Sequence, residues 1–146
     1  MVKLSSLMPK RRDFDGKVIA DFRATEGKPG GPVGGQDILL LHHTGARSGI
    51  QRVSPLAYQR VEASFAVFAS KGGASDHPAW YHNLLAHPET SVEVGTETVK
   101  VRARVAEPAE RDVIWNRQKE ILPAFADYEK KAAPRAIPVI ILDPLG

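Results

Sequence analysis

Residues 39–49 read LLLHHTGARSG, in which an apolar run changes abruptly into a turn that contains two glycines. Ile38–Leu41 is continuously apolar, which predicts a strand buried on both faces. Thr44–Gly49 predicts a turn, and Val53–Val61 and Phe65–Ser70 predict two further strands joined by a short polar link. Strands that follow one another through such short connections pair antiparallel.

The second half of the chain contains the clearest hairpin, formed by Ser91–Val94 and Glu97–Val105. Its second strand alternates strictly, with Val99, Val101, Ala103 and Val105 on one face and Lys100, Arg102 and Arg104 on the other. Ile137–Leu142 predicts a last apolar strand. We therefore expect an α+β fold in which about six mainly antiparallel strands curl into a small barrel with few exposed edges.

Helices are expected to flank this barrel at Asp13–Glu26, Pro78–Ala86, Pro108–Leu122 and Ala124–Lys131. In the first of them, Phe14, Val18, Ile19 and Phe22 share one face. We expect this stripe to pack on the barrel. The alternative is a helix that lies on a membrane surface, because the basic run Lys10-Arg11-Arg12 precedes it.

Composition narrows the class of protein. The length of 146 residues predicts a single domain, which we place at residues 13–146. Residues 1–12, which end in the basic run, are expected to form a flexible tail. The absence of cysteine excludes disulfides, thiolate nucleophiles and cysteine-ligated metals. The formal net charge of +3 favours anionic ligands, but no nucleic-acid-binding signature accompanies it. The sequence contains neither a spanning apolar run nor a secretory signal, so we expect a cytoplasmic protein, with membrane association only through the first helix.

Two loops have residues suited to a ligand. Gly45–Gly49 with Gln51 and Arg52 combines flexible backbone with two arginines, which suits phosphate or carboxylate. The alternative is a basic surface hairpin. Ser70–Gly73 follows a strand with a hydroxyl, a cation and two glycines, so that backbone could approach a flat ligand. Its alternative is an ordinary exposed turn.

Histidines are frequent but do not indicate a metal. His77, His82 and His87 are five residues apart, a spacing that keeps helical side chains from converging, so we expect no metal site. His42 and His43 are adjacent on a strand and point to opposite faces, so at most one can line a pocket.

Five segments in series carry a family resemblance: residues 39–49, Ser54-Pro55-Leu56, residues 69–74 (ASKGGA), residues 77–84 (HPAWYHNL), and His87-Pro88 leading to Val92–Gly95. Together they make the chain similar to the deazaflavin-dependent nitroreductase and quinone reductase family, whose members use coenzyme F420. The resemblance covers roughly residues 14–142.

The resemblance implies a split β-barrel of the flavin-reductase kind, with residues 13–146 as a deazaflavin-binding domain. It places the anionic tail of the cofactor at Arg47, Ser48, Gln51, Arg52 and Lys71. It places the ring against Ser54, Pro55, Leu56, Ala69, Ser70, Gly72 and Gly73, with Trp80, Tyr81 and Asn83 beside it.

The implied reaction is hydride transfer from reduced F420 to a quinone-like, nitroaromatic or other conjugated hydrophobic acceptor. Leu122, Phe125 and Tyr128 stand where a nitroimidazole-activating member has several tyrosines, so the acceptor pocket is more apolar here. Tyr128 and Ser70 are the candidate proton donors, with water as the alternative. Two other functions stay open: an oxidoreductase of this barrel type that uses FMN, and a non-catalytic carrier of the deazaflavin or another hydrophobic ligand. A homodimer is also expected.

Overall fold

Both faces of strand β1 (Ile38–Thr44) are covered, which places this strand at the centre of the packing. The computed structural model describes residues 11–146. Leu39 and Leu41 point into the barrel, whereas Ile38 and Leu40 pack outward in a second hydrophobic cluster. The expected strand buried on both faces is therefore confirmed, and it is longer than the apolar run that predicted it.

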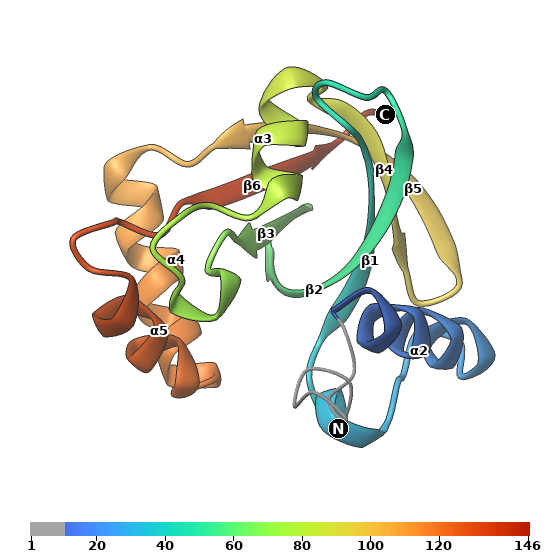
Figure 1. Cartoon of the computed structure of the whole chain (residues 1–146), viewed down its shortest axis with the longest axis horizontal. Coiled ribbons are helices and arrows are strands. Elements are labelled where there is room, and N and C mark those ends of the chain that lie inside the picture. The colour runs from blue at the N-terminus through green and yellow to red at the C-terminus, as the bar shows by residue number, and fades with distance from the viewer. Residues whose placement is uncertain (1–10) are drawn as a thin grey trace, which may run out of the picture.

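Six antiparallel strands close into a barrel in the order β1-β2-β3-β6-β5-β4 (Figure 1). The remaining strands are β2 (Gln51–Val61), β3 (Ser64–Phe68), β4 (Glu89–Val94), β5 (Glu97–Val105) and β6 (Val139–Pro144). The hairpin β4–β5 has the expected alternation: Val101 is fully buried and Lys100 is exposed. Val105, expected on the buried face, is 46% exposed because it lies at the end of its strand.

The barrel is split between β2 and β3. Strand β2 pairs with β1 over Gln51–Ala57, but its pairing with β3 covers only Tyr58–Val61. The first part of β2 therefore has a strand neighbour on one edge, and β3 turns away from it. The expected split β-barrel is confirmed, and this divergence creates the space in which the candidate site lies.

Within residues 11–146, four α-helices flank the barrel: α2 (Arg11–Ala24), α3 (Ala79–Ala86), α4 (Pro108–Ile121) and α5 (Ala124–Ala132). Two short 3-10 helices, η1 (Gly31–Val33) and η2 (Lys71–Gly73), lie in the connections. Figure 1 shows α2 beside β1 and β2, and α4 and α5 together on the other side of the split. Helix α2 begins two residues before its expected start, and residues 1–10 of the expected tail lie outside the described residues.

The apolar stripe of α2 is used by the barrel. Phe22 is buried against Ile38 and Leu40, and Val18 is also buried. This packing favours the interpretation that the apolar stripe packs on the barrel, and these residues give no support to a helix on a membrane surface. None of the helices within residues 11–146 combines the length and apolar character needed to cross a membrane.

An ion-pair cluster fastens the C-terminal end of α2 to the sheet. Arg23 donates two hydrogen bonds to the Glu93 carboxylate on β4, of 3.1 and 2.7 Å. The same carboxylate lies 2.7 Å from Nε2 of His42 on β1. The hydrogen bond from Arg23 is the main cause of the lowered pKa of Glu93, against an opposing effect of burial.

Glu93→Gln is expected to destabilise the protein by roughly 0.5–1 kcal/mol at neutral pH, because the pair is only partly shielded from solvent. A carboxylate whose pKa is lowered on folding stabilises the protein above its unfolded pKa, and this contribution is lost as the pH falls through the lowered value. The free energies of unfolding in urea of the wild-type protein and of Glu93→Gln should therefore differ at pH 7 and converge at acidic pH. Glu97→Gln, on the exposed end of β5, is the control, and an equal loss from both substitutions would contradict the cluster's role.

Candidate functional site

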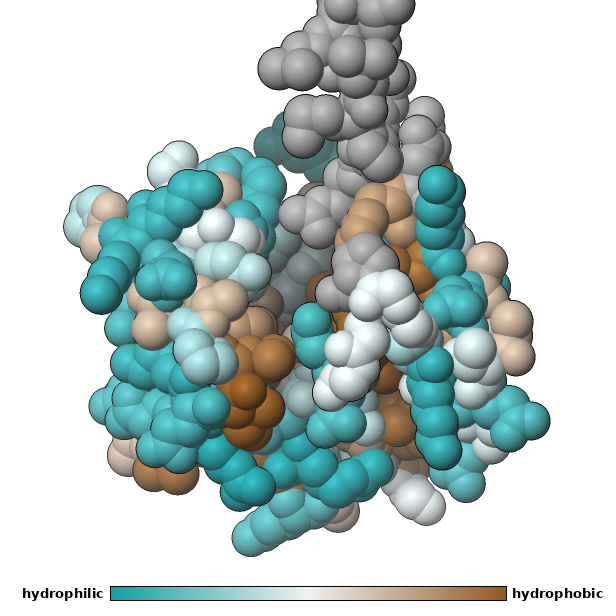
Figure 2. All heavy atoms as spheres, turned by 90° about the horizontal axis from the view of Figure 1, so that it is seen from below, coloured by the Kyte–Doolittle hydropathy of each residue, from teal (hydrophilic) through white to brown (hydrophobic). Residues whose placement is uncertain are grey.

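A cleft of about 1100 Å³ lies at the split. Its walls come from the part of β2 that does not pair with β3, from α2, from the turn after β1, from η2, and from α3 and α5. Figure 2 views the molecule from below Figure 1 and shows hydrophobic residues at the bottom of a hollow between two largely hydrophilic halves. A long planar ligand with a polar end would match such a space.

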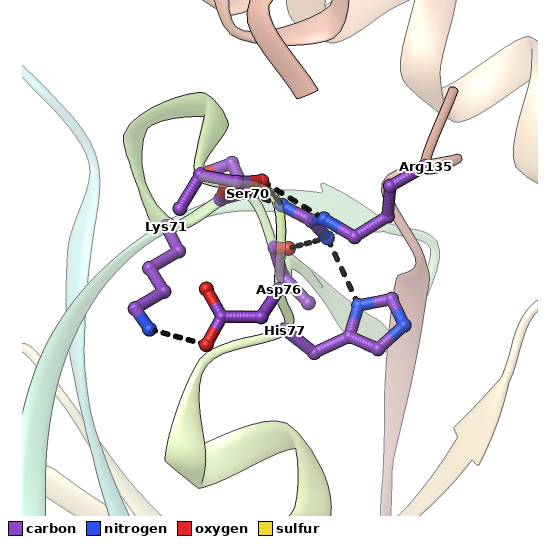
Figure 3. Close-up of polar contacts among 7 residues, drawn as sticks. Ser70, Lys71, Asp76, His77 and Arg135 are labelled. Carbon is purple, nitrogen blue, oxygen red and sulfur yellow. Dashed lines mark hydrogen bonds and ion pairs between the residues drawn. The ribbon is translucent and has the colours of Figure 1, made fainter. Parts of the chain in front are cut away.

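The polar part of the cleft is basic. Arg47 from the turn after β1, Arg52 from β2 and Lys71 from η2 all line it, and all three are exposed. The ammonium group of Lys71 lies 3.0 Å from Oδ2 of Asp76 (Figure 3), and this contact is the main cause of the lowered pKa of Asp76. Lys71 thus has an internal carboxylate partner that an anionic ligand would have to replace.

A buried chain of hydrogen bonds forms the inner wall beside these cations. Oδ1 of Asn83 accepts the Ala46 backbone N–H at 2.9 Å, and Nδ2 of Asn83 lies 2.9 Å from Nδ1 of His43. Nε2 of His43 lies 2.9 Å from Oγ of Ser54. Burial, followed by the charges of Arg52 and His42, lowers the pKa of His43 to about 4, so its imidazole is neutral at physiological pH.

The cleft also has apolar lining. Leu56 on β2, Phe125 and Tyr128 of α5 and Phe14 of α2 all line it. The rings of Phe125 and Tyr128 are 5.2 Å apart at a tilt of 54°, which fixes the face that α5 presents. A conjugated hydrophobic molecule could be accommodated here without leaving polar groups unpaired.

Arg135 holds the loop that supplies Ser70 and Lys71 (Figure 3). Its guanidinium donates to the carbonyl oxygens of Ala69, Ser70 and Ala74 at 2.8–3.0 Å, and its remaining N–H points to Nδ1 of His77 at 2.9 Å. All five donors of the fork are thereby used. The backbone around η2, which includes residues with positive φ at Lys71 and Gly72, is fixed from behind the cleft.

Most of the expected site residues meet in this cleft. Those that line it are Arg47, Ser48, Arg52, Ser54, Pro55, Leu56, Ser70, Lys71, Gly72, Trp80, Asn83 and Tyr128. Four do not. Gln51 is exposed and donates to Thr44, Ala69 is fully buried in the barrel core, and Tyr81 packs on that core beside His77. Gly73 is buried against α5, where an added Cβ would lie 2.9 Å from the backbone oxygen of Tyr128.

Sequence reasoning missed two residues that shape the site. It treated His43 as one of an undecided pair, although its position on the inward face beside Leu39 and Leu41 distinguishes it from His42. It passed over Arg135, which precedes the last strand and has no local signal at all. His77 and His82 also lie closer than their spacing predicts, with ring centroids 5.9 Å apart, because His77 precedes α3 and does not follow helical geometry.

The fold is a split barrel, and the cleft at its split is lined by both cations and apolar side chains, which suits an anionic ligand that also has an apolar part. The model of one family, the F420H(2)-dependent quinone reductases, matches residues 16–144. The chain belongs to this family of oxidoreductases.

Individual relatives agree. An F420H(2)-dependent quinone reductase of Mycobacterium tuberculosis is 35% identical over 127 residues, which cover 84% of this chain and 85% of the relative. A solved F420-H2 dependent reductase, FDR-A, is 39% identical with a TM-score of 0.66, covering 73% of this chain and 93% of that one. Another solved structure, described as a domain-swapped dimer, is 36% identical with a TM-score of 0.69, covering 86% and 91%.

Arg135→Ala is expected to destabilise the protein by about 2–4 kcal/mol, because several carbonyl groups lose a charged donor at once. Arg135→Lys should recover only part of this loss, since an ammonium group cannot reproduce the planar fork. The free energy of unfolding in urea measures both. The surface variant Arg102→Ala should change the free energy of unfolding by less than about 0.5 kcal/mol. A similarly small effect of Arg135→Ala would refute the stabilising role of the hydrogen bonds that Arg135 donates.

Proposed function

We propose that this protein transfers a hydride from reduced F420 to a quinone-like acceptor held at the apolar part of the cleft. The observation that carries the proposal is that one cleft is lined both by three cations, Arg47, Arg52 and Lys71, and by the apolar or aromatic side chains of Leu56, Phe125 and Tyr128. The family and the names of the relatives support the cofactor and the quinone. A nitroaromatic acceptor, a cytoplasmic location and a homodimer stay predictions, although the domain-swapped neighbour supports pairing.

The residues of the cleft fit this cofactor. The exposed cations suit the phosphate and carboxylates of its tail, since charge-assisted hydrogen bonds to such groups are the strong ones. Pro55, Leu56 and Gly72 offer flat or small surfaces to a planar ring. The bound deazaflavin supplies the hydride, while the protein binds, aligns and excludes water.

The acceptor would lie between α2 and α5. Phe14 and Val18 on one side and Phe125 and Tyr128 on the other surround the space with apolar groups. Holding the two reactants at roughly 3–3.5 Å is the main contribution such a site can make to the rate. Ser70 and Tyr128 both line the cleft, and their hydroxyl groups are the proposed proton donors to the reduced acceptor.

The test is a steady-state assay with purified protein, chemically reduced F420 and menadione, followed by the return of the oxidised deazaflavin absorbance. Turnover that saturates in both substrates is expected. FMN supplied in place of F420 tests the alternative oxidoreductase. Tight binding of F420 without oxidation would favour a carrier and would contradict the proposal. Where turnover is found, Tyr128→Phe and Ser70→Ala show whether either hydroxyl limits kcat.

Arg47→Ala and Lys71→Ala are each expected to weaken F420 binding about tenfold with little change in kcat at saturation, because they remove contacts made equally before and during the reaction. Asp76→Asn should act in the opposite direction, since it releases Lys71 from its internal partner. Quenching of deazaflavin fluorescence on titration measures all three. Unchanged affinity in both alanine variants would remove these cations from the site.

A further inference from the structure

The chain of hydrogen bonds behind Ser54 has a fixed direction. A backbone N–H can only donate, so the atom of Asn83 that faces the Ala46 N–H is its oxygen. The amide NH2 of Asn83 must then face His43, and it donates to Nδ1. The reverse orientation of the amide would place two donors against each other at 2.9 Å.

This direction determines the tautomer of His43. Its Nδ1 accepts a hydrogen bond and therefore has no proton, and the neutral ring must have its proton on Nε2. The Nε2–H group donates to Oγ of Ser54 at 2.9 Å. His43 is 4% exposed and Asn83 is 6% exposed, so water cannot easily rearrange the chain.

The last member of the chain lies at the cleft. The hydroxyl oxygen of Ser54 accepts from His43, which leaves its own O–H proton free for a second partner. Among the residues that the structure describes, no acceptor for this proton is found. Ser54 is half-buried and lines the cleft on the same face of β2 as Arg52 and Leu56, which lie two residues before and two residues after it.

We propose that His43 is a positioning residue that fixes the Ser54 hydroxyl as a hydrogen-bond donor to an oxygen atom of the bound cofactor. The inference rests on the proposed function for the identity of that cofactor. The neighbours of Ser54 allow two sources of the oxygen: a carbonyl group of the ring or a phosphate of the tail. His43 itself touches no ligand and acts only through Ser54.

The direction of the chain can be tested without any ligand. In protein labelled with 15N, the chemical shifts of the histidine ring nitrogens distinguish the two neutral tautomers. We expect His43 to have its proton on Nε2 at neutral pH, and Asn83→Leu should remove this preference. A His43 ring protonated on Nδ1, or averaged between both forms in the wild-type protein, would overturn the inference.

Binding of F420 tests the role of the chain. His43→Asn places an amide near the Nδ1 position and loses the bond to Ser54, whereas His43→Gln can keep a donor near the Nε2 position. Ser54→Ala and His43→Asn are each expected to weaken binding roughly fivefold. His43→Gln should recover most of the loss, and His87→Asn, on an exposed histidine, is the control for loss of an imidazole.

The double variant separates positioning from general damage to the fold. If His43 acts through Ser54, the combination of His43→Asn with Ser54→Ala weakens binding no further than Ser54→Ala alone. A change in the absorption band of bound F420 in Ser54→Ala identifies the ring carbonyl as the partner. A loss of affinity with an unchanged band identifies the phosphate.

The possible failures are distinguishable. Wild-type affinity in both single variants, or losses that multiply in the double variant, would overturn the role of His43 and leave the proposed function intact. Absence of F420 binding by the wild-type protein would refute the proposed function and this inference with it.

Discussion

The site depends on where the hydrogen bonding between β2 and β3 stops. Pairing ends at Tyr58 and Val67, while β1 continues to pair with β2 as far as Gln51. Beyond that point one edge of β2 faces a cleft where another strand would otherwise lie. An open strand edge is ordinarily a liability in a soluble protein, and here α2, η2 and α5 cover its surroundings and leave a ligand-sized space.

The elements around this space are fixed by polar contacts that lie outside it. Arg23 and Glu93 anchor the end of α2 that lies away from the cleft, while Phe14 at its other end lines the cleft. Arg135 holds the backbone around η2 through its carbonyl oxygens. Such contacts hold the backbone of Ser70 and Lys71 in place beside the cleft, although the side chain of Lys71 must exchange Asp76 for an anionic ligand.

Sequence patterns predicted the barrel well because period-two alternation and continuous apolar runs report directly on strand burial. Family resemblance also predicted which loops meet at the cleft. Local sequence patterns could not have done so, because nothing in them indicates that Arg47 and Lys71 line the same cleft. They failed where a residue acts through tertiary contacts. Arg135 has no neighbours in sequence that reveal its partners, and Gly73, expected beside the cofactor ring, permits the close approach of α5. Ala69 and Tyr81 belong to recognisable motifs, but the barrel core uses their side chains.

The direction of the hydrogen bonds along the inner wall of the cleft follows from a single backbone N–H group. The Ala46 N–H lies in the glycine-containing turn that also presents Arg47, and it orients Asn83 on α3. Asn83 in turn orients His43, and His43 orients Ser54, so the turn after β1 influences both the charge and the hydrogen-bond direction of the cleft. Burial keeps His43 neutral, which is required because a protonated ring would present a second donor to Asn83 and break the chain. The hydrogen-bond chain through Asn83 and His43 is neutral, although it lies beside the exposed Arg47 and Arg52. It therefore fixes the Ser54 hydroxyl as a donor without placing a further charge next to the apolar lining of the cleft.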